Sequence, residues 1–225
     1  MKRYLLILII FLAAHFVFAQ EKADLNATRF QQEIDNFSAW DAKNATPDSA
    51  ILFIGSSSIR FWKTHDAFPN QPVINRGFGG AHISDMIYYY DQIAKPFNPD
   101  VIVFYCGDND IEYGKPVEQV YADFLQIMDS LATDFPEAHF VYLPIKPCQS
   151  RWSYWPKMQK FNEKVAAYCD QNKLYHYLDT ASPMLGEDGK PNSKLYRDDA
   201  LHLNEDGYKI WDRLLANLLA GIKND

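Results

Sequence analysis

The chain has 225 residues, of which 48% are hydrophobic and 15% aromatic, so it is long enough to bury the core of one well-packed domain. Its formal net charge at pH 7 is −7, and it has no run rich in lysine or arginine. This acidic balance argues against nucleic acid and anionic membrane surfaces as partners.

The N-terminal residues have the pattern of a targeting segment rather than of a folded domain. A basic pair precedes a short apolar run that ends in small residues at Ala19, which suits signal peptidase. The run is short for a membrane span, so we expect a cleaved signal peptide at 1–19 and one domain at 20–225. The mature chain would then be secreted or periplasmic, without stable insertion in a membrane. An uncleaved N-terminal anchor is the alternative.

Five apolar runs predict the strands of a parallel sheet. The first and third are apolar throughout, which is typical of strands that are buried on both faces. The expected strands lie at 51–54, 72–75, 100–107, 139–144 and 174–180.

Segments with a helical spacing of apolar residues alternate with these strands. The expected helices lie within 21–44, at 83–93, from Pro116 onward, at 156–170, and from Asn204, which can cap the last helix. Strands that alternate with helices imply right-handed βαβ units and a parallel sheet that is covered on both faces. The sequence therefore predicts a single α/β domain.

A serine cluster follows the first expected strand. Gly55 allows the backbone to turn sharply, Ser56, Ser57 and Ser58 come next, and a helix is expected to open after them. In an open parallel sheet this turn lies in the crevice where ligands bind, so a serine here is a candidate nucleophile. The three serines can equally be helix-capping residues.

Two further strand ends carry groups that could hold negative charge. The second strand leads into a glycine-rich loop, in which Gly79 and Gly80 let a backbone N–H approach a substrate closely. Asn109 follows the third strand and can point its amide into the same crevice. An ordinary glycine turn and an Asx turn are the alternatives.

The candidate base is His202, just before the last expected helix. Asp199 stands three residues earlier and can curl back to accept a hydrogen bond from Nδ1, so that Nε2 faces outward. A structural role is expected for His65, in a polar loop, and for His139 and His176, within strands.

The serine turn, the glycine-rich loop, the segment around Asn109 and the Asp199–His202 pair follow one another along the chain as four short sequence blocks. These blocks and their order resemble those of the SGNH hydrolase family, also called GDSL-like esterases, over essentially the whole mature chain. The matching blocks are Phe53–Ser57, Asn75–Gly80, Gly107–Asp110 and Asp199–His202. The resemblance implies a flavodoxin-like three-layer sandwich, with a five-stranded parallel sheet and helices on both faces.

The resemblance also implies roles for individual residues. Ser57 would be the nucleophile of a triad with His202 and Asp199, and the oxyanion hole would consist of the Ser57 and Gly80 N–H groups and the Asn109 amide. The implied chemistry is two-step ester hydrolysis, which needs no metal or organic cofactor. Two positions depart from the family pattern: Ser56 replaces the usual Asp before the nucleophile, and Ala81, followed by His82, replaces an Asp that is common after Gly80.

The loop at 146–155 should reach the same edge as Ser57 and suggests a substrate. Arg151 can donate hydrogen bonds, while Trp152 and Trp155 offer flat apolar faces, so these three are candidate substrate-binding residues. The rings can equally pack beneath the loop as core. We expect a short acyl ester, in particular acetyl, on a small-molecule or oligosaccharide alcohol. A lysophospholipase and a non-catalytic carbohydrate-binding protein on the same fold are the alternatives.

The chain has three cysteines, an odd number for a protein that is expected to be exported. Cys106, Cys148 and Cys169 are expected to be free, with a Cys106–Cys148 pair as the alternative. No cluster of cysteine and histidine in the sequence suggests a metal site.

Overall fold

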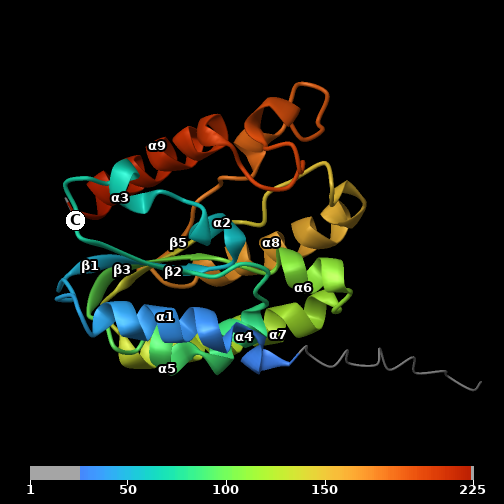
Figure 1. The fold of residues 1–225 in the computed structure, drawn as a ribbon. Coiled ribbons are helices and arrows are strands. Elements are labelled where there is room, and N and C mark those ends of the chain that lie inside the picture. Colours follow the sequence, from blue (N-terminus) through green and yellow to red (C-terminus); the bar gives the residue numbers. More distant parts are fainter. Residues whose placement is uncertain (1–25, 224–225) are drawn as a thin grey trace, which may run out of the picture.

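The structure is a computed structural model that describes residues 26–223 (Figure 1). Its centre is a sheet of five parallel strands in the order β2-β1-β3-β4-β5. The strands are β1 (Ala50–Gly55), β2 (Val73–Gly77), β3 (Pro99–Tyr105), β4 (His139–Tyr142) and β5 (Tyr175–Tyr177). All five expected strands are present, with ends that differ by a few residues from the predicted ones. The expected signal peptide at 1–19 lies outside the described residues.

Side chains of the central strands alternate between two hydrophobic layers, as strand geometry requires. In β1, Leu52 and Ile54 belong to one core cluster, whereas Ile51 and Phe53 belong to the other. All six residues of β1 are buried, because helices cover both faces of the sheet.

The helices form the two outer layers of a three-layer sandwich, which confirms the predicted fold class. In Figure 1, α9 and α3 lie above the sheet, while α1 and α5 lie below it. The upper layer contains α2 (Ser57–Arg60), α3 (Thr64–Ala67) and α9 (Glu205–Ile222). The lower layer contains α1 (Gln31–Asp41), α4 (Ile83–Tyr88), α5 (Tyr90–Ile93), α7 (Val117–Asp134) and α8 (Trp155–Cys169).

Several helix boundaries follow from the sequence, and others do not. Asn204 caps α9 as predicted, since its Oδ1 accepts a hydrogen bond from the Gly207 N–H at 3.0 Å. The helix expected at 83–93 is divided at Tyr89 into α4 and α5. The sequence did not predict α6 (Asp108–Tyr113). Within the helix expected at 21–44, the described part forms a 3₁₀ turn, η1 (Ala27–Phe30), and α1.

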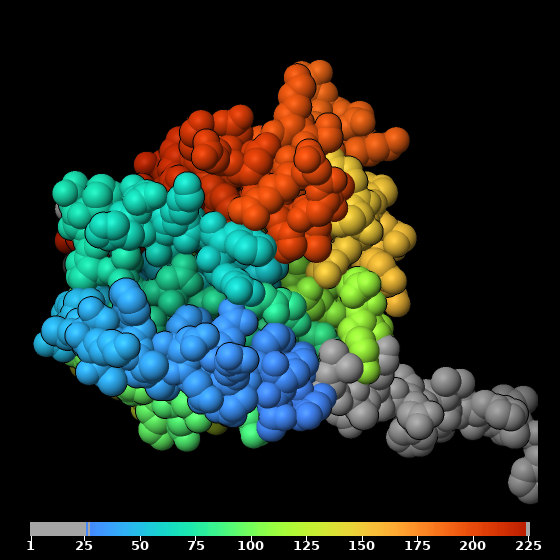
Figure 2. Space-filling view, in the orientation of Figure 1, coloured from blue at the N-terminus to red at the C-terminus, as the bar shows by residue number. Residues whose placement is uncertain are grey.

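The C-terminal third of the chain contains short irregular segments. Three further 3₁₀ turns occur there: η2 (Trp152–Tyr154), η3 (Ser182–Met184) and η4 (Ser193–Leu195). Between η3 and η4, a bridge joins Leu185 to Pro191, and the segment it closes projects from the body in orange in Figure 2. None of the described helices combines the length and apolar character needed to cross a membrane.

The three cysteines are free, and each is at most 3% exposed. Burial raises the pKa of the Cys106 thiol well above its usual value. Burial also raises the pKa of Cys169, to about 12.

Candidate active site

The carboxyl ends of the central strands deliver the predicted site residues to one edge of the sheet. At the end of β1, Gly55 has a φ of +146°, and a Cβ there would lie 2.0 Å from the carbonyl oxygen of Tyr105 in β3. Only glycine therefore fits where β1 turns into α2. Ser57 is the first residue of α2.

Neighbouring elements hold α2, which is only one turn long. The Tyr208 hydroxyl in α9 donates to the Ser58 carbonyl at 2.8 Å. From β2, Asn75 Nδ2 donates to the Ile59 carbonyl at 2.9 Å. These contacts fix the backbone beside Ser57 from two sides, so its placement does not depend on the stability of a short helix.

The structure brings Ser57, His202 and Asp199 together in one hydrogen-bonded line. Ser57 Oγ lies 2.9 Å from His202 Nε2, and His202 Nδ1 lies 2.6 Å from Asp199 Oδ2. The His202 side chain is 19% exposed and that of Asp199 is 46% exposed. The histidine is therefore within reach of a substrate bound at Ser57.

The electrostatics of Asp199 determine which nitrogen of His202 carries the proton. Partial burial raises the pKa of Asp199, but hydrogen bonds from the His202 ring and from the backbone N–H groups of His202 and Leu201 lower it to about 2. An ionised carboxylate only accepts, so His202 Nδ1 must donate to it. In the neutral ring, Nε2 then accepts the proton of the Ser57 hydroxyl.

The turn that carries Asp199 and His202 has an unusual backbone. Ala200 has a φ of +53°, in the left-handed region that residues with a Cβ rarely adopt. Its N–H donates to the Arg197 carbonyl at 2.9 Å, and its carbonyl accepts from the Ser150 N–H and Oγ. Contacts outside the turn thus stabilise a conformation that the chain would otherwise avoid.

One of the predicted oxyanion donors, Asn109, contacts the loop that contains another, Gly80. Asn109, in α6, donates from Nδ2 to the carbonyl of Ala81 at 2.9 Å, which ties it to the residue that follows Gly80. This bond uses one N–H of the amide and leaves the second one. No described residue accepts a backbone hydrogen bond from the N–H of Ser57 or Gly80.

Segments that are far apart in the sequence meet on one face of the molecule. In Figure 2 the cyan segment of α2 lies against the red-orange segment near residue 200, with the yellow segment near residue 150 and the light green α6 beside them. A family model described as GDSL-like Lipase/Acylhydrolase matches residues 60–210. The chain belongs to this family. Its enzyme class is that of the carboxylic ester hydrolases.

The match includes Gly80, Asn109, Asp199 and His202, whereas Ser57 lies three residues before it. The match confirms the predicted family resemblance, and three of the four sequence blocks lie within the matched residues. Among curated proteins, an uncharacterized protein of Mycoplasma pneumoniae is 31% identical over 121 residues, and this chain spans 14% of its length.

Solved structures share the GDSL-like fold. A Streptococcus pneumonia protein, described as a platelet activating factor, has a TM-score of 0.75 at 22% identity, over 84% of this chain and 92% of its own. A GDSL-like lipase from Bacteroides thetaiotaomicron has a TM-score of 0.74 at 19% identity, with coverages of 84% and 98%. A carbohydrate esterase family 3 protein from Talaromyces cellulolyticus has a TM-score of 0.61 at 15% identity, with coverages of 78% and 99%. These likenesses establish the fold.

The two departures from the GDSL-like pattern are buried. Ser56 is 0% exposed, and its N–H donates to the Tyr105 carbonyl at 3.0 Å, while its hydroxyl has no partner among the described atoms. Ala81 is also 0% exposed, and His82 is the N-cap residue of α4, with its N–H donating to Asp85 Oδ2 at 2.7 Å. Both departures therefore lie in the protein interior, where they do not face solvent.

The candidate substrate-binding residues differ in their surroundings. Arg151 Nη2 donates to Asn109 Oδ1 at 2.9 Å, so its guanidinium contacts the protein itself. Trp152 and Trp155 stack on each other at a centroid distance of 6.0 Å. Trp155 is 9% exposed and belongs to the core, whereas Trp152 is half-buried against it. For Trp155, this favours the alternative that the ring packs as core.

Phe61 is a site residue that the sequence analysis missed. Its ring lies 5.0 Å from the ring of His202 at an angle of 87°, and the residue is 36% exposed. The guanidinium carbon of Arg197 lies 4.6 Å from the centroid of the same Phe61 ring. The available signal was its spacing, since a residue four positions after Ser57 lies on the same helical face.

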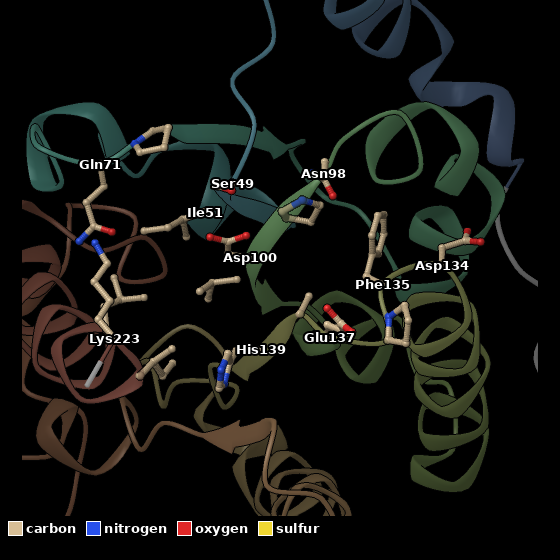
Figure 3. Close-up of a pocket in the computed structure, with 17 residues that line it drawn as sticks. Ser49, Ile51, Gln71, Asn98, Asp100, Asp134, Phe135, Glu137, His139 and Lys223 are labelled. Carbon is tan, nitrogen blue, oxygen red and sulfur yellow. The ribbon is translucent and has the colours of Figure 1, made fainter. Parts of the chain in front are cut away.

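A cavity of about 860 Å³ lies at the amino ends of the strands, at the opposite end of the sheet from Ser57 (Figure 3). It is lined by residues at the amino ends of three strands, Ile51, Pro99 and His139. It is therefore separate from the site at the carboxyl ends. Within residues 26–223, no group of three His, Cys, Asp or Glu side chains is arranged to hold a metal ion.

Proposed function

We propose that this protein is a serine esterase that hydrolyses short acyl esters, in particular acetyl esters, of a carbohydrate or another polar alcohol. The observation that carries the proposal is the line from Ser57 Oγ to His202 Nε2, 2.9 Å, and from His202 Nδ1 to Asp199 Oδ2, 2.6 Å. A nucleophile, a base and an orienting acid within hydrogen-bond reach are the minimum set for acyl transfer through serine.

Hydrolysis then proceeds in two steps. His202 Nε2 takes the proton of Ser57 as Oγ attacks the ester carbonyl, and Asp199 stabilises the imidazolium that forms. The tetrahedral intermediate collapses by breaking the bond to the alcohol oxygen, which leaves with the proton from Nε2. Water next gives a proton to Nε2 and attacks the acyl-Ser57 carbonyl, which releases the acid and restores the hydroxyl.

The oxyanion of each tetrahedral intermediate is assigned to the N–H groups of Ser57 and Gly80 and to the remaining N–H of Asn109. Donors placed in advance around a developing charge need no reorganisation during the reaction, and a single one typically contributes about 10²–10³ in rate.

The surroundings of the site support a short acyl group and a polar alcohol. The alcohol must lie beside His202, which protonates it, and therefore beside the exposed ring of Phe61 and the charge of Arg197. An apolar ring next to a hydrogen-bond donor suits a sugar. Next to Asn109 lies the ion pair of Arg151 and Asp108, which disfavours burial of a long alkyl chain.

Labelling with a serine-directed fluorophosphonate tests the enzyme class. We expect the wild type to be labelled and Ser57→Ala to lose both labelling and ester hydrolysis while remaining folded. Ser56→Ala and Ser58→Ala, which change the flanking buried serines, should keep appreciable activity. Loss of activity in either flanking variant but not in Ser57→Ala would refute the assignment, and a wild type without labelling would favour a non-catalytic binding protein.

A substrate panel tests the ester class. It combines nitrophenyl esters of increasing acyl length with acetylated xylo-oligosaccharides and a lysophospholipid. We expect the highest kcat/KM for acetyl esters and release of acetate from the sugars. Highest kcat/KM on long acyl chains, with no acetate released, would contradict the proposal and favour a lysophospholipase.

We also propose that the chain is exported, with cleavage after Ala19, on the basis of its N-terminal sequence pattern. N-terminal sequencing of the mature protein tests this, and a cytosolic protein that begins at Met1 would contradict it.

A further inference from the structure

The amide of Asn109 can act as an oxyanion donor in only one of its two orientations. Its nitrogen carries two N–H donors, whereas its oxygen only accepts. A rotation of the carboxamide by half a turn would aim the oxygen at the developing negative charge. The site therefore needs a contact that distinguishes the two ends of this group.

Two hydrogen bonds make this distinction. Arg151 Nη2 donates to Asn109 Oδ1 at 2.9 Å, and a guanidinium has no acceptor with which it could bind the nitrogen end. On the other side, Asn109 Nδ2 donates to the Ala81 carbonyl at 2.9 Å, which cannot bind the oxygen end. Both bonds select the same orientation and leave one N–H of the amide for a substrate.

Arg151 is itself held in place by charge and by buried polar groups. Its Nη1 lies 3.1 Å from Asp108 Oδ2, an ion pair without aligned hydrogen-bond geometry, in which the side chains are 13% and 6% exposed. The Tyr105 hydroxyl donates to the same oxygen at 3.3 Å, and Lys146 Nζ donates to that hydroxyl at 3.1 Å. Lys146 is 2% exposed. A chain of buried contacts thus restrains the guanidinium from behind.

We propose that Arg151 is a positioning residue of the oxyanion hole, which holds the Asn109 carboxamide with one N–H facing the substrate. This inference rests on the proposed ester hydrolysis through Asn109. In this role Arg151 binds other residues of the protein and does not bind the substrate, because Nη1 and Nη2 both face protein acceptors.

This role affects the transition state more than the ground state. The charge that Asn109 binds develops only when Ser57 attacks, so loss of its orientation lowers kcat and leaves KM nearly unchanged. An arginine that binds substrate directly would instead raise KM. The split between kcat and KM therefore separates the two roles.

The test compares Arg151→Met and Arg151→Lys with Arg213→Met, which removes an exposed arginine within α9. With a nitrophenyl acetate substrate, we expect Arg151→Met to lower kcat about 10- to 100-fold, below the loss of a whole donor, with KM within about twofold. Arg151→Lys, which keeps the charge but not the planar fork, should fall between wild type and Arg151→Met. Arg213→Met should match the wild type.

A double mutant sharpens the kinetic test. In an Asn109→Ala background, Arg151→Met should lower kcat by less than about twofold, because the group that it positions is gone. An equal loss in both backgrounds, or a rise in KM with kcat unchanged, would overturn the positioning role.

A second readout does not require activity. The side-chain amide signals of Asn109 in a ¹⁵N–¹H spectrum, identified by their loss in Asn109→Ala, should move in Arg151→Met and stay in place in Arg213→Met. Unchanged signals would overturn the inference even in an active enzyme, while a wild type that neither hydrolyses esters nor reacts with fluorophosphonate would overturn the proposed function alone. If Arg151→Met fails to fold, Arg151→Lys carries the same comparisons.

Discussion

The carbonyl oxygen of Ala200 accepts two hydrogen bonds from Ser150, one from the backbone N–H at 3.2 Å and one from Oγ at 3.1 Å. Ser150 directly precedes Arg151, whose guanidinium binds Asn109. Two neighbouring residues of one loop therefore contact the turn that carries Asp199 and the amide of the predicted oxyanion hole. The loop before α8 joins the two halves of the site.

Removing the Ser150 hydroxyl should loosen the turn around Ala200. Ser150→Ala keeps the backbone bond, so we expect a loss of about 0.5–1.5 kcal/mol in the free energy of unfolding. We also expect kcat to fall by less than about tenfold, which corresponds to about 1.4 kcal/mol in the barrier. Urea unfolding and ester kinetics measure both. The control is Ser153→Ala, at an exposed serine of η2; identical behaviour of the two variants would contradict the expectation.

Ala200→Gly should separate stability from activity. A φ of +53° costs a residue with a Cβ about 1–2 kcal/mol, which exceeds the entropic cost of about 0.5–1 kcal/mol for glycine. We therefore expect this variant to be more stable in urea, with a lower kcat because the turn that holds His202 gains freedom.

A matched control is Ala216→Gly at an exposed position of α9, where the helical backbone suits alanine. It should lower the free energy of unfolding by about 1 kcal/mol. If both glycine variants lose stability to the same extent, strain at Ala200 is not significant.

Substitutions of Asn109 should act on the chemical step. We expect Asn109→Ala to lower kcat about 10²–10³-fold with little change in KM, because it removes one donor to the oxyanion. Asn109→Asp places an acceptor where a donor is needed and should lower kcat further. Steady-state kinetics on an acetyl ester measure both variants, and an Asn109→Asp protein with wild-type kcat would remove this residue from the oxyanion hole.

The pH dependence of stability should report the ionisation of Asp199. Its pKa of about 2 in the fold lies below the value of about 3.9 for a free aspartate. A lowered folded pKa means that ionised Asp199 stabilises the fold above about pH 4, and that this contribution is lost as the pH falls toward 2. In thermal unfolding, the stabilisation of wild type over Asp199→Asn that comes from the ionised carboxylate should therefore shrink as the pH falls below about 4. A difference that grows on acidification would contradict this sign.

Loss of a buried ion pair next to the site should strongly lower the free energy of unfolding of the protein. Lys115 Nζ lies 3.0 Å from Asp110 Oδ1 and 3.1 Å from Asp123 Oδ2, and the Lys115 and Asp110 side chains are 0% exposed. Burial raises the pKa of Asp110, and the charge of Lys115 opposes that shift. Lys115→Met would leave a buried carboxylate without this partner, so we expect a loss of about 3–5 kcal/mol in urea unfolding.

The control for this pair is Lys164→Met. Lys164 forms an exposed ion pair with Glu118 at 4.0 Å, and loss of such a pair costs at most about 1 kcal/mol. Equal unfolding midpoints for the two lysine variants would show that the buried pair contributes no more than the exposed one.

The strands of this protein are predictable from its sequence because both faces of the sheet are covered. A strand such as β1 must then be apolar along its whole length, and the run is visible without any knowledge of its partners. The pairing of Asp199 with His202 is also predictable, since it is local. The contact of His202 with Ser57 is not local, because it depends on the order of the strands in the sheet. The sequence indicated this contact only through the family resemblance.

Other features leave little trace in the sequence. The helix α6 is short and polar, and it lies between Gly107 at φ +116° and Gly114 at φ +98°, so no apolar spacing reveals it. Apolar residues continue through the break at Tyr89, where the backbone leaves the helical region at ψ 11°. The contact of Arg151 with Asn109 depends on the path of a loop, and spacing along the chain does not predict it.

The burial of all three thiols makes them internal reporters of opening. A thiol reagent attacks the thiolate, and neither access nor a normal pKa is available to Cys106 or Cys169 in the closed fold. Alkylation under native conditions therefore waits for local or global unfolding, and its rate measures how often each region opens. Cys106 reports the segment directly after β3, Cys148 the loop before α8, and Cys169 the last turn of α8. One labelling series therefore distinguishes local opening near the site from unfolding of the rest of the domain.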